Sequence, residues 1–233
     1  MRFDLNILSD TILVVLQAVP RVLLLALVVL ILGIGLGALI ALVRRRRIPI
    51  LDQLLEIFIS YMRGVPLIVH LFIIRYSLPN VAASFMNLLG FGMEPNDFPN
   101  ILLIIVAFTL LEAAIESENI RGALNAVSKD QVEAALSIGM TKKQSLQRII
   151  FPQALTVAIP LFLNAYLKAI KIQSLAFTVG VVDILTQARF AAALSYHYLE
   201  SYLAAALVYW LICGLLQVAF DHLSQKISFE KGV

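Results

Sequence analysis

Residues 22–43 read VLLLALVVLILGIGLGALIALV, without a single charge, and the next four residues are Arg44–Arg47. An apolar run of this length is enough to cross the hydrocarbon core of a bilayer as one helix. Basic clusters mark the cytoplasmic side of membrane proteins, so the arginine run is expected to fix that end of the helix in the cytoplasm. Gly33 and Gly37 lie on one helix face and predict close packing against a neighbouring helix.

The composition of the whole chain agrees with an integral membrane protein. The 233 residues are 61% hydrophobic and 14% charged, with a net charge of only +3. Soluble domains are about 25% charged, so a disordered, collagen-like or soluble nucleic-acid-binding chain is excluded. The single cysteine, Cys213, excludes an intramolecular disulfide, and the sequence contains no metal-ligand spacing. At about 20 residues per span, the chain has room for roughly five spans.

The apolar runs predict five membrane spans, at about residues 22–43, 56–76, 101–118, 151–168 and 202–220. Residues 63–66 (RGVP) predict a kink in the second span. Residues 77–100 contain no Lys or Arg and are expected in an outside loop, whereas residues 121–150 are basic and are expected in the cytoplasm. Residues 174–182 are too short to cross and predict a re-entrant or surface helix.

This topology places the N-terminus outside and the C-terminus inside the cell. Residues 1–18 are interpreted as an outer-surface amphipathic helix that leads into a transmembrane domain over residues 19–225. A sixth span at the N-terminus is the alternative.

Residues 128–152 carry the clearest local signals. The sequence SKDQ at 128–131 is a capping-box pattern that predicts a helix start, and Gly139 is suited to ending that helix in a left-handed conformation. A second capping box, TKKQ at 141–144, predicts another helix before Pro152. Small and apolar residues on the first helix would let another protein approach closely. An ordinary cytoplasmic loop is the alternative interpretation.

The spacing within this segment resembles the EAA signature of permease subunits of ABC importers. The matching residues are Glu133, Ala134, Ala135, Gly139, Ile149 and Pro152, with Phe151 where the signature has Leu. Four further segments resemble the branch that carries polar amino acids (histidine, glutamine, arginine and cystine). They are residues 63–67 (RGVPL), 118–122 (ENIRG), 152–154 (PQA) and 171–175 (KIQSL). The resemblance covers roughly residues 20–220.

The resemblance implies an all-α integral membrane fold of the MetI-like type I ABC importer permease class, with about five transmembrane helices and a cytoplasmic coupling helix. In that family the EAA helix docks on a cytoplasmic ATPase dimer, and an extracytoplasmic solute-binding protein delivers the solute. The sequence lacks the phosphate-binding pattern G-x-x-x-x-G-K-[ST], so ATP-Mg is expected on a partner ATPase chain, with no cofactor or enzymatic activity in this chain. A second permease copy or a close paralogue is also implied, in the bacterial inner membrane and without nucleic acid.

Ionisable residues within predicted spans are expensive, and they are therefore candidates for function. The candidates for substrate binding are His70, Arg75, Glu112, Glu116, Asn164 and Lys168. Arg75 or Lys168 would meet the carboxylate of an amino acid, and the Glu112–Glu116 pair, one helical turn apart, would meet its ammonium group. His70 stands where the family usually has Gln and would add a polar contact.

Two extra carboxylates suit a solute with more than one amino group, such as cystine or a basic amino acid. The alternative is an internal ion-pair network that only holds helices together, for example Glu118 with Arg121. The family carries small, apolar or aromatic residues at Glu112 and Glu116, which leaves the transported solute open.

Other functional classes agree less well with the sequence. An intramembrane enzyme would need H-E-x-x-H or G-x-S-x-G, and neither occurs. An ion-coupled secondary transporter predicts an inverted repeat, and none is evident. An ABC importer permease for another small solute remains the closest alternative. The arginine run would suit anionic lipid headgroups, although its role in setting the topology is a sufficient explanation.

Overall fold

The computed structural model describes residues 3–229. The regular secondary structure of these residues is entirely helical, with no strand. The helices are α1 (Leu5–Leu16), α2 (Val19–Arg45), α3 (Pro49–Gly64), α4 (Leu67–Leu88), α5 (Asn100–Asn125), α6 (Lys129–Ser137), α7 (Lys142–Ser145), α8 (Phe151–Ile172), α9 (Ile184–Ser195) and α10 (Tyr198–Phe229). Two 3-10 helices, η1 (Pro95–Asp97) and η3 (Gln173–Val179), and one π-helical turn, η2 (Leu146–Ile150), complete the described chain. The all-helical fold confirms the predicted class.

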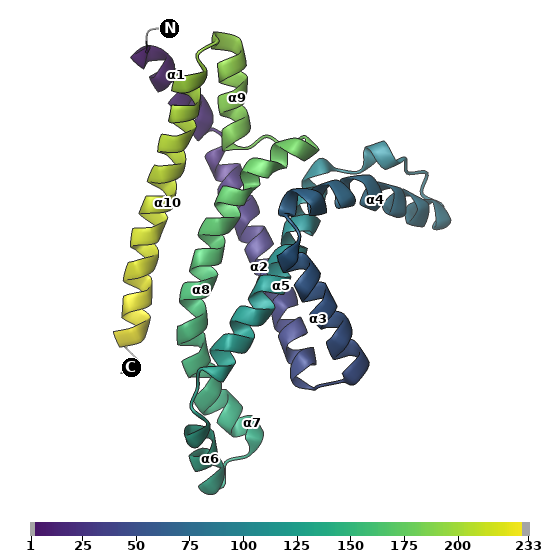
Figure 1. The fold of residues 1–233 in the computed structure, drawn as a ribbon, viewed down its shortest axis with the longest axis vertical. Coiled ribbons are helices and arrows are strands. Elements are labelled where there is room, and N and C mark those ends of the chain that lie inside the picture. The colour runs from purple at the N-terminus through teal and green to yellow at the C-terminus, as the bar shows by residue number, and fades with distance from the viewer. Residues whose placement is uncertain (1–2, 230–233) are drawn as a thin grey trace.

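Five of the described helices are long and apolar enough to cross a membrane. They are Val19–Arg45, Leu67–Leu88, Asn100–Asn125, the continuous stretch Lys142–Val179, and Tyr198–Gln225. In Figure 1, α6 and α7 lie at one end of the bundle, and α1 and α9 lie near the other. We call these the α6 end and the α9 end. α4 projects sideways from the body of the bundle (Figure 1).

The central contact of the bundle is between α2 and α5, and at two positions on α2 it is made by glycines that have no side chain. A Cβ atom added to Gly33 would lie 2.7 Å from Cβ of Glu112. A Cβ atom added to Gly37 would lie 2.9 Å from both the carbonyl oxygen of Ala113 and the amide nitrogen of Ser117. The close packing predicted from the two glycines is therefore confirmed, and it involves the part of α5 that carries both glutamates.

The second predicted span differs from the structure. Instead of one kinked helix over residues 56–76, the chain forms α3 and α4 with a break between them. Val65 and Pro66 both have non-helical backbones, with ψ 137° for each. At Val65 the cause is the ring of Pro66, which disfavours helical geometry at the residue before it. Helix α4 then continues to Leu88, so residues 77–88 of the expected outside loop are helical despite Pro79.

The α9 end is built around α1 and a short irregular stretch. Val15 of α1 is fully buried with Val22, Ile184 and Ala205, in a core shared by α1, α2, α9 and α10. The expected short helix at residues 174–182 is η3, which ends at Gly180 with a left-handed backbone (φ 81°). Gln173 anchors it by donating to the carbonyl of Val22 at 2.9 Å. Whether α1 lies on the outer membrane surface stays a prediction.

The α2–α5 contact gives a direct stability prediction. Gly37→Ala should lower the midpoint of thermal unfolding of the purified protein, because the added methyl group collides with backbone atoms of α5. Overpacking of this kind costs about 1–3 kcal/mol. Gly35→Ala is the matched control, since a Cβ there meets nothing within 4 Å. Equal unfolding midpoints for the two variants would contradict the close contact.

Candidate functional site

The α6 end carries the predicted helix–turn–helix, and its local signals are confirmed. The Ser128 side chain caps α6 by accepting from the amide of Asp130, and α6 is followed by Gly139 with φ 87°. Thr141 and Gln144 form a reciprocal capping box at the start of α7, with hydrogen bonds of 2.8 and 3.2 Å. Each helix of this segment therefore begins where a side chain satisfies its free amide groups.

The segment is joined to α8 more firmly than the sequence indicates. Gln131, expected to complete the first capping box, instead accepts a hydrogen bond of 2.7 Å from Gln153 at the start of α8. The short α7 runs directly into α8 through the π-helical turn η2, immediately before Pro152. Proline cannot donate the regular helical hydrogen bond, which favours an irregular turn here. Helix α6 is thus connected to α8 both through the backbone and by a side-chain contact.

The residues of the EAA-like pattern divide into an exposed and an internal set. Glu133, Ala134 and Gly139 are exposed, and Ile138 beside them is 77% exposed. Ala135 is buried, and α6 packs against α7 and η2. Ile149 and Pro152 are half-buried. The expectation that both alanines allow the approach of a partner is therefore revised, because only Ala134 faces outward while Ala135 packs within the segment.

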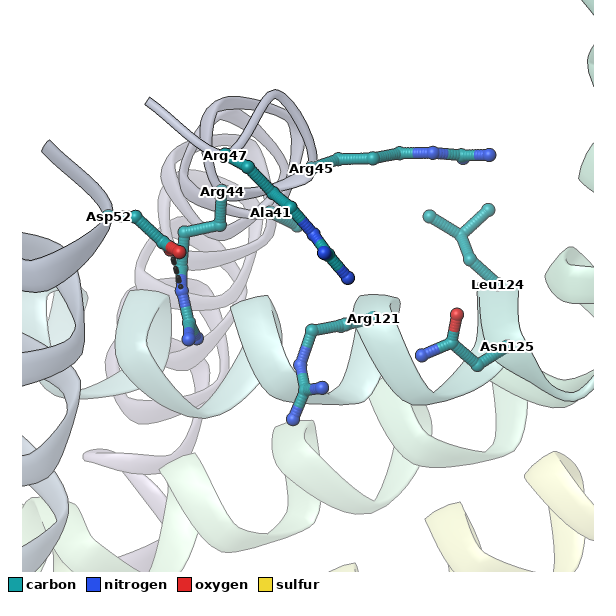
Figure 2. A pocket seen from close by; sticks show the side chains of 8 residues that line it. All are labelled: Ala41, Arg44, Arg45, Arg47, Asp52, Arg121, Leu124 and Asn125. Atoms are coloured by element: carbon teal, nitrogen blue, oxygen red, sulfur yellow. Dashed lines mark hydrogen bonds and ion pairs between the residues drawn. The ribbon is translucent and has the colours of Figure 1, made fainter. Parts of the chain in front are cut away.

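An ionic network ties together α2, α3 and α5 at the C-terminal end of α2. Arg44 donates to Asp52 at 3.0 Å and to Glu118 at 2.6 Å. Arg121 also pairs with Glu118, and this i,i+3 pair confirms the example of an internal network considered above. The Arg44–Asp52 pair, drawn as a dashed line in Figure 2, joins α2 to the helix that folds back beside it. Pro49, at the start of α3, indicates that the chain begins a new helix here. The ion pair between Arg44 and Asp52 depends on tertiary structure and could not be predicted from the sequence.

Two of the predicted substrate residues lie together in the middle of the bundle, and a third lies on the neighbouring helix α8. Glu112 and Glu116 are fully buried on α5, beside the two glycines of α2. Neither oxygen of Glu112 has a hydrogen-bond partner among the described residues, whereas Glu116 accepts from Asn119 at 3.2 Å. Lys168 is exposed on α8, which packs against α5, and its positive charge acts on both carboxylates without an ion pair to either among the described residues. Asn164 is exposed one helical turn earlier on α8.

His70 and Arg75 lie on α4, and no hydrogen bond or ion pair among the described residues joins them to the carboxylate pair. His70 is buried, its ring centroid 5.1 Å from that of Tyr61, and both of its nitrogens lack a hydrogen-bond partner in the described part of the chain. Arg75 donates to the carbonyl of Val179 at 3.3 Å. It also lines a cavity of about 430 Å³, together with Asn80 and Asn100.

These features define a helical membrane protein with an exposed helix fixed to one of its spans and a buried carboxylate pair. The family model of the binding-protein-dependent transport system inner membrane component matches residues 33–229. The chain belongs to this family, and it is a permease subunit of a type I ABC importer in the inner membrane.

Similar proteins agree with this family. The chain is 39% identical to the probable amino-acid permease protein YxeN of Bacillus subtilis, over 90% of this chain and 91% of the relative. It is 33% identical to the L-cystine transport system permease protein TcyL of the same organism, over 97% and 92% of the two chains. A crystal structure of an amino acid ABC transporter with histidines is similar to it with a TM-score of 0.83 and 25% identity, covering 97% of this chain and 100% of that one.

The ionic network predicts a measurable contribution of Glu118 to stability. Glu118→Gln should lower the thermal unfolding midpoint, because two guanidinium groups lose their shared carboxylate. Hydrogen bonds to charged groups contribute about 1.5–3 kcal/mol. Asp10→Asn, an exposed position on α1, is the control for loss of one negative charge. A midpoint for Glu118→Gln as high as that of the control would show that the network does not stabilise the fold.

Proposed function

We propose that this chain forms the transmembrane pathway of an ATP-driven, binding-protein-dependent importer of polar amino acids, with cystine or a basic amino acid favoured. Relatives named as amino-acid, cystine and arginine permeases support an amino-acid substrate. The observation that carries the proposal is the exposed face of α6 together with its C-cap residue. This face presents Glu133, Ala134 and Ile138 on a segment fixed to α8. We count Ile138 as part of the exposed face of α6.

In this proposal the exposed face of α6 docks on a cytoplasmic ATPase dimer, which binds ATP-Mg. The α6 end, with the arginine run, lies in the cytoplasm, and the α9 end faces the extracytoplasmic binding protein. This orientation places the N-terminus outside and the C-terminus inside. A second permease, identical or closely related, completes the pathway.

The structure supports a physical route from α6 to the polar cluster. The Gln131–Gln153 hydrogen bond and the helical connection through η2 would transmit a movement of α6 to α8. Helix α8 carries Lys168, whose charge attracts Glu112 and Glu116 on α5. Movement of α8 past α5 would therefore change how well Lys168 neutralises the two carboxylates. When Lys168 moves away from Glu112 and Glu116, the ammonium group of the substrate would take its place as the neutralising positive charge.

The unpartnered oxygens of Glu112 support its proposed role in substrate binding. A buried carboxylate without hydrogen bonds is costly, so a cationic group that reaches it would be bound strongly. Lys168 or Arg75 would meet the substrate carboxylate, with Asn164 and His70 as further polar contacts. Arg75 lines its own cavity, which favours a role before the solute reaches Glu112 and Glu116.

The docking proposal predicts the effect of replacing Ile138, the exposed apolar residue that caps the C-terminal end of α6. Ile138→Gln should weaken co-purification of the ATPase about tenfold or more and reduce uptake, because burial of an isoleucine side chain contributes about 1.5–3 kcal/mol. Leu194→Gln on α9, where the residue is 85% exposed, is the matched control for co-purification of the ATPase. Normal assembly and uptake with Ile138→Gln would refute docking through this face.

The substrate proposal predicts the effect of neutralising each buried carboxylate. In proteoliposomes containing the assembled transporter, Glu112→Gln and Glu116→Gln should each raise the KM for a dibasic substrate about tenfold, because an ion pair is lost in a dry site. Uptake of cystine, arginine, histidine and glutamine would be compared. An unchanged KM, together with a lowered unfolding midpoint, would assign both residues a purely structural role.

A further inference from the structure

Four arginines line one cavity at the C-terminal end of α2. The cavity has a volume of about 410 Å³, within the range of about 300–1,000 Å³ found for sites of small molecules. Arg44, Arg45, Arg47 and Arg121 line it together with Asp52 and Asn125 (Figure 2). Arg121 and Asn125 come from the end of α5, so the cavity lies between the ends of two spans.

The cavity has an excess of positive charge. Arg44 and Arg121 are already paired with Asp52 and Glu118. Arg45 and Arg47, in contrast, make no ion pair or side-chain hydrogen bond with any described residue. Asp52 is the single acidic side chain among the residues that line the cavity. The guanidinium groups of Arg45 and Arg47 therefore remain to bind an anion.

The backbone at Arg47 helps to build this site. Arg47 has φ 51°, a left-handed conformation that residues with side chains seldom adopt. Its amide donates to the carbonyl of Arg44 at 3.1 Å, which closes the turn between α2 and α3. In Figure 2 the side chain of Arg47 extends from this turn across the cavity, toward the part of α5 that carries Arg121 and Asn125.

The position of the cavity indicates where the anion comes from. The arginines follow the apolar run of α2 directly, so they lie where hydrocarbon gives way to headgroups. Ala41 and Leu124 add apolar atoms to the cavity wall. Leu42 and Ile50 nearby in the chain are 53% and 75% exposed and are available to acyl chains. A soluble phosphate would use the charges but none of this apolar surface.

We propose that this cavity binds the phosphate group of an anionic phospholipid headgroup. Guanidinium groups bind phosphate through paired hydrogen bonds, and basic pockets between membrane helices are suited to such headgroups. Arg45 also lines the neighbouring groove formed by Leu136, Lys142 and Ile150 of the α6–α8 segment. An occupied cavity would therefore hold the end of α2 beside this segment. The inference depends neither on the transported solute nor on ATPase docking.

The test uses the purified full-length chain in detergent, titrated with short-chain phosphatidylglycerol and followed by native mass spectrometry. Short-chain phosphatidylcholine and inorganic phosphate form the two comparison titrations. Arg45→Gln and Arg47→Gln each remove a free guanidinium from the cavity. Arg46→Gln is the matched control, because it removes the same charge from the same run at a residue that does not line the cavity.

We expect phosphatidylglycerol to bind at least tenfold more tightly than phosphatidylcholine. Arg45→Gln and Arg47→Gln should each weaken that binding about fivefold, and Arg46→Gln should leave it within twofold of the unmodified protein. Equal losses in all three variants would show a diffuse charge effect and overturn the site. Displacement of the lipid by inorganic phosphate of equal affinity would assign the cavity to a soluble anion and overturn the lipid proposal.

Discussion

The close approach of α2 to α5 is the contact on which the rest of the bundle depends. Gly33 and Gly37 let the backbone of α5 lie where side chains would otherwise stand, so Glu112 and Glu116 are sealed between helices. The same approach brings Arg44 within 2.6 Å of Glu118. Helix α5 also contacts α3, α4 and α8, which makes it the central element of the fold. A side chain at either glycine would collide with the part of α5 that carries Glu112 and Glu116.

The strongest sequence signals were local, and they predicted local structure well. The caps at Ser128 and Thr141 and the left-handed Gly139 depend on hydrogen bonds and backbone sterics within a few residues, and all three are confirmed. Features that depend on tertiary structure are harder to predict from the sequence. Three features depend on which helices pack together. They are the burial of Ala135, the ion pair between Arg44 and Glu118, and the separation of α3 from α4. One sequence does not specify those partners.

The candidate substrate residues show the same division. Their position within spans could be read from the apolar pattern, and the helical spacing correctly placed Glu112 and Glu116 on one face. The proximity of Lys168 to both carboxylates depends on the packing of α8 against α5. His70 and Arg75 are ionisable residues within the same predicted span, yet Arg75 donates to the carbonyl of Val179, at the end of η3. Burial and charge alone therefore do not define one site.

ATP-driven transport by this chain requires the exposed face of α6 to bind the protein that hydrolyses ATP. A photoreactive amino acid incorporated at Ile138, with Leu194 as the reference position, tests this in intact cells. We predict a crosslink from position 138 to a nucleotide-hydrolysing subunit and none from position 194. Crosslinks from position 138 to an extracytoplasmic protein, or none to any ATPase, would contradict the account.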